Sequence, residues 1–70
     1  SEDAIRILTK SLSSQNVALI FSASQALADI PNPLAEDALR SLQNNNADPL
    51  IQEAAQSALA RLQNLLNSKS

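Results

Sequence analysis

The chain has 70 residues and a formal net charge of −2, and it contains no Gly, Cys, His, Tyr or Trp. Without Cys or His it lacks thiolate chemistry and the commonest zinc ligands, and without Gly it cannot form a glycine-rich phosphate loop. Its five basic residues form no cluster and it has a single aromatic residue, which argues against nucleic-acid binding. We therefore expect no catalysis, no cofactor and no metal site.

No apolar run approaches the roughly 20 residues that a membrane-spanning helix needs, and the first residues are acidic rather than signal-like. We expect a soluble cytoplasmic protein that does not bind membranes. Because the chain does not start with Met, we also expect a processed protein or part of a longer one. Val occurs once and Ala, Leu, Ser and Gln dominate, so the composition predicts an all-α fold.

The first predicted helix runs from about Glu2 to Leu12, with Ser1 as its cap and acidic residues in its first turn. Arg6 follows Glu2 by four residues and Asp3 by three, which places opposite charges side by side on the exposed face. The predicted buried stripe, with Ile7 beside it, consists of Ala4, Ile5, Leu8 and Leu12.

The second predicted helix runs from about Gln15 to Ile30 and stops at Pro31, which disfavours helical geometry in the residue before it. Its predicted inner face consists of Leu19, Ala23, Ala26, Leu27 and Ile30.

The third predicted helix runs from about Pro33 to Gln43, because Asn32 can cap it and proline suits the first helical position. Glu36 and Arg40 are expected to pair on its surface. Its predicted buried residues are Leu34, Ala35, Ala38, Leu39 and Leu42. The asparagines from Asn44 to Asn46 are expected to end it, since Asn tolerates a left-handed helix end better than other residues with a side chain.

The fourth predicted helix repeats the same start, with Asp48 as cap and Pro49 at the first position, and runs to Leu66. Apolar residues recur at spacings of three and four, as on one face of a helix. They are Ile51, Ala54, Ala55, Ala58, Leu59, Leu62, Leu65 and Leu66. Residues 67–70 are expected to fray.

The two halves of the chain resemble each other. Residues 2–6 match residues 36–40 at an offset of 34, and residues 23–30 match residues 55–62 at an offset of 32. Each half is therefore predicted to be a helical hairpin, with first helix stacked on first and second on second. Asp29 and Arg61 are equivalent residues of opposite charge, so we expect a surface ion pair worth at most about 1 kcal/mol.

The segment Asp48-Pro49-Leu50-Ile51-Gln52-Glu53-Ala54-Ala55, followed by Ala58-Leu59, resembles the HEAT-like repeats, in particular the short type of phycobilisome-lyase-like proteins. The family pattern has Arg at Gln52 and Gly at Ala60, and the first copy of the motif, around Asn16 to Ala23, is more degenerate. The resemblance implies one α-solenoid domain of four antiparallel helices over residues 1–70. Repeat 1 covers about 1–31 and repeat 2 about 32–66.

Phe21 is the only aromatic residue, and the equivalent positions of Ile20 and Phe21 are Gln52 and Glu53. One reading is that Ile20 and Phe21 cover core at the open end of the stack. The other is a protein-binding face around an exposed aromatic residue. That face consists of Phe21, Ser24, Gln25, Ala28, Glu53, Gln56, Ser57, Ala60 and Asn64.

The sequence thus predicts a non-catalytic protein-interaction or assembly module of HEAT-like repeats within a larger protein, with a protein partner. Flanking repeats or a homodimer are expected to cover one end of the stack, because two repeats are fewer than solenoids usually need. The resemblance implies one alternative, a fragment of a bilin lyase or phycobilisome-associated factor. A second alternative is a carboxylate-rich adaptor or regulatory tail without a solenoid partner.

Overall fold

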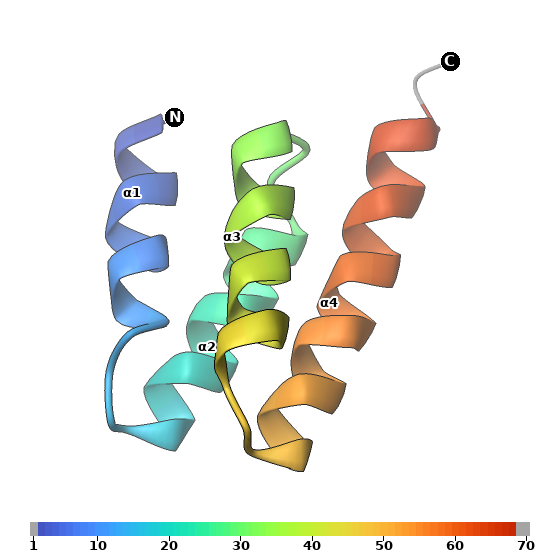
Figure 1. Cartoon of the computed structure of the whole chain (residues 1–70). Coiled ribbons are helices and arrows are strands. Elements are labelled where there is room, and N and C mark those ends of the chain that lie inside the picture. Colours follow the sequence, from blue (N-terminus) through green and yellow to red (C-terminus); the bar gives the residue numbers. More distant parts are fainter. Residues whose placement is uncertain (1, 69–70) are drawn as a thin grey trace.

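A computed structural model describes residues 2–68, and within that range it contains four α-helices and no strand (Figure 1). The helices are α1 (Glu2–Ser11), α2 (Val17–Ala28), α3 (Pro33–Asn45) and α4 (Pro49–Asn67). The prediction of an all-α chain with four helices in this order is confirmed. Ser1 and residues 69–70 lie outside the described range, so the expected cap at Ser1 and the frayed end at 69–70 do too. Asn67, expected to fray, is helical, and the N–H of Ser68 donates to the carbonyl of Asn64.

Three helices begin at side-chain caps. Asn16 Oδ1 accepts from the backbone N–H groups of Ala18 and Leu19, at 3.0 and 3.3 Å. Asn32 Oδ1 and Asp48 Oδ1 each accept from the N–H two residues on, both at 2.9 Å, and a proline follows each cap. These bonds satisfy N–H groups that have no partner within the helix. The capping predictions for α3 and α4 are therefore confirmed.

The bounds of α2 and α3 differ from the prediction. The second helix begins at Val17 rather than Gln15, because Asn16 has an extended backbone and caps the helix. It ends at Ala28, since Asp29 and Ile30 form tighter bonds to the carbonyls three residues back before Pro31. The third helix continues to Asn45, and Asn46 ends it with extended backbone at φ −112°. The expected left-handed end is wrong, because no described residue has positive φ.

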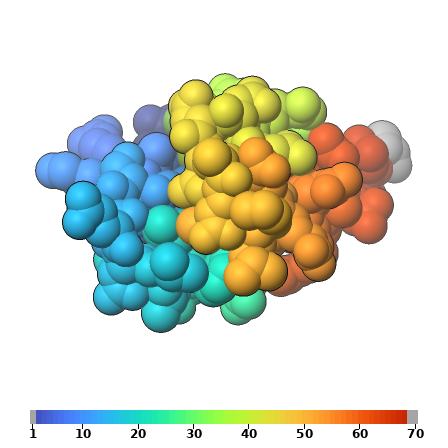
Figure 2. Space-filling view, turned by 60° about the horizontal axis from the view of Figure 1, so that its bottom comes forward, coloured from blue at the N-terminus to red at the C-terminus, as the bar shows by residue number. Residues whose placement is uncertain are grey.

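The chain forms two consecutive helical hairpins. In Figure 1, α1 runs down at one edge and α2 returns upward behind α3, and then α3 runs down and α4 returns at the other edge. The most extensive contact is between α3 and α4, followed by that between α2 and α4. Helix α1 contacts α2 and α3, and within residues 2–68 it makes no close contact with α4. Figure 2 shows the two hairpins as adjoining halves of one body.

The core lies between the two hairpins and contains many alanines, which let helix backbones approach closely. Leu27, Leu39 and Leu62 are fully buried in it, one each from α2, α3 and α4. The buried apolar residues are Ile5, Leu12, Ile20, Ala23, Leu27, Ala28, Ala35, Ala38, Leu39, Leu42, Ile51, Ala55, Ala58, Leu59 and Leu62.

Several apolar residues expected in the core are exposed. Leu19 is exposed in α2, and Leu34 is exposed in the first turn of α3, where it borders a groove between α1 and α3. Leu65 is exposed because α4 is longer than α2, and it lies beyond the end of that helix next to Asp29. Those only partly buried are Ala4, Leu8, Ala26, Ile30, Ala54 and Leu66.

The inner face of α2 is also broader than predicted, because this helix contacts all three others. Besides Ala23 and Leu27, it buries Ile20, Ser24 and Ala28, which lie four residues apart on the neighbouring side of the helix.

Two leucines of α4 provide a matched test of this core. Leu62 is 0% exposed and Leu50 is 66% exposed. We expect Leu62→Ala to lower the free energy of unfolding by about 2–5 kcal/mol, because it removes buried methyl groups and leaves a cavity. Leu50→Ala should change it by less than about 0.5 kcal/mol. Urea denaturation followed by circular dichroism measures both free energies of unfolding. Equal losses for the two variants would contradict the assignment of Leu62 to the core and of Leu50 to the surface.

Candidate protein-interaction surface

The outer side of α4 is lined by residues that project away from the core. Ile51, Ala55 and Leu62 define the buried side of this helix. Because an α-helix turns by about 100° per residue, positions 53, 57, 60 and 64 lie on the opposite side, with position 56 next to them. Glu53, Gln56, Ser57, Ala60 and Asn64 are all exposed, and so is Gln25 on α2. The structure therefore leaves six of the nine predicted face residues exposed.

Ser24 and Ala28 do not belong to an exposed face. Ser24 is 1% exposed and Ala28 is 0% exposed, because the contact between α2 and α4 covers this side of α2. The hydroxyl of Ser24 donates to the carbonyl of Ile20 at 2.8 Å, which satisfies the polar group inside the core. The prediction that these two residues are available to a partner is therefore wrong, because both lie in the core beneath the exposed residues.

Phe21 lies at the edge between core and surface. It is partly buried and packs against the core cluster, whereas Ile20 beside it is fully in the core. The reading that both residues cover core is therefore confirmed for Ile20, and Phe21 packs against the core while part of it stays exposed. The exposed part of Phe21 remains on the same side of α2 as Gln25, four residues on.

We define the outer surface as the exposed or partly exposed members of the predicted face. They are Phe21, Gln25, Glu53, Gln56, Ser57, Ala60 and Asn64.

An ion pair joins the two hairpins next to this surface. Arg61 Nη2 donates to Asp29 Oδ1 at 2.5 Å, and both side chains are largely exposed. The pair links α4 to the residue that ends α2, so the prediction from the internal repeat is confirmed.

A second polar cluster joins α3 to α4. Arg40 Nη2 donates to Glu36 Oε2 at 3.0 Å, as predicted, and Gln63 Nε2 donates to the same oxygen at 3.4 Å. These hydrogen bonds, that from Arg40 first, hold the pKa of the Glu36 carboxyl below its ordinary value. The cluster is a structural link, because each polar group already has a partner within the chain.

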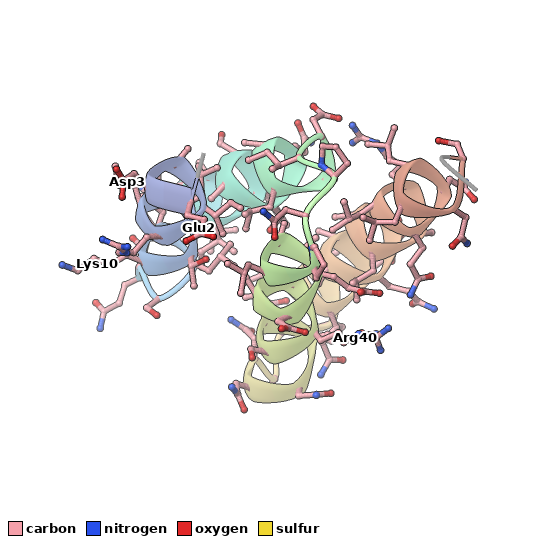
Figure 3. The ribbon with its side chains drawn as sticks, turned by 90° about the horizontal axis from the view of Figure 1, so that it is seen from above. Glu2, Asp3, Lys10 and Arg40 are labelled. Carbon is pink, nitrogen blue, oxygen red and sulfur yellow. The ribbon has the colours of Figure 1, made fainter. Side chains whose placement is uncertain are left out.

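An open groove of about 670 Å³ lies between α1 and α3, on another side of the molecule. Figure 3 shows Asp3 and Lys10 projecting away from the bundle, and Arg40 on the other side of α3. The groove has apolar residues from both helices and charges of both signs: it is lined by Glu2, Ile5, Arg6, Thr9, Lys10, Leu34, Asp37, Ala38 and Ser41. The sequence alone did not predict this groove, because the groove depends on the distance between two helices.

Arg6 forms an ion pair with Asp3 at 3.6 Å, as the spacing of three residues predicted.

Within the described residues, no group of three or more His, Cys, Asp or Glu could hold a metal ion. No helix in that range is both long enough and apolar enough to cross a membrane. Every buried side-chain nitrogen and oxygen described has a hydrogen-bond partner.

The chain matches no protein-family model, no curated protein sequence and no solved structure. Its resemblance to HEAT-like repeats therefore rests on its own residues.

The lowered pKa of Glu36 predicts a pH dependence of stability. Because the folded-state pKa lies below the ordinary value of 4.5, the stabilisation is present above that pH and is lost as the pH falls through the folded value. We expect Glu36→Gln to lower the melting temperature at pH 7, and the difference from the parent protein to shrink as the pH falls to about 3. Glu53→Gln is the control, since Glu53 is an exposed glutamate with no such hydrogen bonds in the structure. If the difference in melting temperature between Glu36→Gln and the parent protein did not vary with pH, the hydrogen bonds to the Glu36 carboxylate would not stabilise the fold.

The Asp29–Arg61 pair is tested by a double-mutant cycle with Asp29→Asn, Arg61→Gln and the double variant. For an exposed pair we expect a coupling energy between about 0.2 and 1 kcal/mol that decreases with added salt, because mobile ions screen exposed charges. Urea denaturation at low and high ionic strength measures it. A coupling energy of zero at low salt would show that the pair does not stabilise the contact between α2 and α4.

Proposed function

We propose that this chain is a non-catalytic protein-interaction module made of two stacked HEAT-like repeats, which acts within a larger assembly. In this proposal α1 and α2 form the first repeat, and α3 and α4 form the second. The partner is a protein, and it binds the outer surface formed by α2 and α4.

The agreement between burial and internal repeat supports the stacking of two equivalent units. Some residues at matching positions share the same environment: Ala23 and Ala55 are both buried, and so are Leu27 and Leu59. The contacts of α1 with α3 and of α2 with α4 follow the order expected of stacked hairpins. Stacked helices of this kind offer a broad surface, on which affinity is distributed over many modest contacts.

The partial exposure of Phe21 is the observation on which the proposed location of the binding site depends. A few residues, often aromatic, contribute most of the binding energy of a protein interface, and near-neutral contacts around them exclude water. Phe21 is the only aromatic residue of the chain and lies on the side of α2 that also carries Gln25, while Ser57 and Asn64 line the outer side of α4. A partner that covers this surface would bury the exposed part of the ring and meet mainly neutral hydrogen-bonding groups, with Glu53 as the charged residue among them.

The alternative of a bilin-lyase fragment rests on the family resemblance. It predicts a coloured covalent adduct when the chain is incubated with a phycobilin and an apo-phycobiliprotein, whereas the interaction module predicts none.

The binding site is tested by site-specific photo-cross-linking in cells that produce the protein. We expect a cross-linking amino acid at Gln25, Gln56 or Ser57 to capture the same partner protein. The matched control is the same amino acid at Thr9, which lies in the groove between α1 and α3. Equal capture from Thr9, or capture of different proteins from the three positions, would contradict the proposed surface.

Ser57→Arg provides the quantitative test with the captured partner. Ser57 is exposed, so the substitution should leave the melting temperature unchanged. We expect it to weaken binding at least about tenfold, because a long charged side chain is forced into the interface. Phe21→Ala is a poorer test, since Phe21 also packs against the core and its loss alters folding.

A further inference from the structure

The first hairpin carries apolar residues on the side that faces away from the second hairpin. In Figure 1, α1 lies at the left edge of the molecule, and α3 lies to its right. Ile7 of α1 is 66% exposed and Leu19 of α2 is 43% exposed. At about 100° per residue, Ala4, Ile7 and Leu8 lie on one side of α1, and Leu19 and Ala26 lie on one side of α2, with Ile30 just past its end. We call these exposed or partly buried residues the open face.

The second hairpin shows what covers such a face. At the offsets of the internal repeat, the equivalents of the open face are Ala38, Ser41, Leu42, Ile51, Ala58 and Leu62. All of these except Ser41 are buried, in a hairpin whose α3 contacts α1 and whose α4 contacts α2. Five of the six positions are therefore apolar in both hairpins. In the second hairpin these positions are buried, because the first hairpin packs against it. In the first hairpin the equivalent residues are exposed or only partly buried.

The other end of the molecule has the opposite character. In the first hairpin, Ile20, Ser24 and Ala28 are buried, but their equivalents Gln52, Gln56 and Ala60 are exposed. Because α2 has α4 packed against it and α4 has no further hairpin beyond it within residues 2–68, we infer that α4 covers this side of α2. The side chain of Gln52 donates to the carbonyl of Asn46 at 2.8 Å, within its own hairpin. A polar end of this kind suits water, as the terminal repeat of a stack requires.

We propose that the open face is an assembly face, and that its occupant is one further helical hairpin of the same repeat type. This inference rests on the stacking of equivalent repeats in the proposed function, and it adds the direction: the stack extends beyond α1 and α2 and closes at α3 and α4. The surface that the further hairpin should present follows from the surface that the first hairpin presents to the second in this structure. The second helix of that further hairpin presents Ile, Ser and Ala four residues apart, like Ile20, Ser24 and Ala28, and its first helix presents an apolar residue like Ile5.

A second copy of this chain does not offer that surface. In each copy the Ile20, Ser24 and Ala28 side is already buried against α4, and the free end of the second hairpin carries Gln52 and Gln56. Stacking of one copy's polar end on another copy's open face would bury the amide of Gln56, for which the structure shows no hydrogen bond, against apolar residues such as Leu19 and Ala26, and this is unfavourable.

The test adds one hairpin to the full chain. Residues 1–35 are placed before Glu2, so that Ala35 of the added copy takes the position of Ser1, as the offset of 34 dictates. The matched control carries Ile20→Gln and Ser24→Gln in the added copy only, which gives it the polar side that α4 has. We expect the extended protein to melt in one transition, at a temperature about 5 °C or more above that of the control. Leu19→Ala in the original copy should lower the melting temperature by several degrees in the extended protein and by much less in the original chain.

Two results would overturn the inference. One is an extended protein that melts like its control, or whose added hairpin melts separately from residues 2–70. The other is a dimer of the original chain in sedimentation equilibrium that Leu19→Lys dissociates, because the occupant would then be a second copy. Cross-linking from Gln25 and Ser57 tests a different surface, so the binding proposal can fail while this one stands, and the reverse.

Discussion

The structure depends on the packing of α4 against two helices at once. Ala55 and Ala58 occupy the buried side of this helix, and their small side chains let it lie close to both α3 and α2. Leu62 is fully buried there together with Leu27 and Leu39, so one helix connects the core of the second hairpin with that of the first. Without this double contact each hairpin would have to bury its apolar residues alone, which a pair of short helices does poorly.

The same contact decides which side of α2 is core and which is surface. An isolated hairpin would bury only the side of α2 that faces α1, but α4 covers a second side and takes Ile20, Ser24 and Ala28 out of water. Polar groups that enter the core in this way have local partners, as the bond from Ser24 to the carbonyl of Ile20 shows. The surface that remains on α2 and α4 is narrower than the sequence predicted, and Phe21 lies at its edge.

The two ends of the molecule differ in a way that matters for assembly. At one end Ile7 and Leu19 are exposed, and at the other end the polar groups of Gln52, Gln63 and Arg40 bond within their own hairpin. Because apolar area in water is unfavourable and satisfied polar groups are not, only the first end gains by being covered. In the function proposed above, a stack that is closed at one end has a defined direction, and the outer surface of α2 and α4 stays accessible to the proposed partner.

Local rules in the sequence determined the helices and the links between them. The caps at Asn32 and Asp48, the prolines that follow them and the stop before Pro31 act within a few residues, so they could be recognised without knowledge of the fold. The internal repeat likewise predicted the Asp29–Arg61 pair, since equivalent positions on neighbouring units lie next to each other. Only the tertiary structure decided that Ser24 and Ala28 are buried, that Leu19, Leu34 and Leu65 are exposed, and that a groove separates α1 from α3. These features depend on which sides of a helix its neighbours cover and on how far each helix extends past the next, and helical periodicity along one segment does not contain that information.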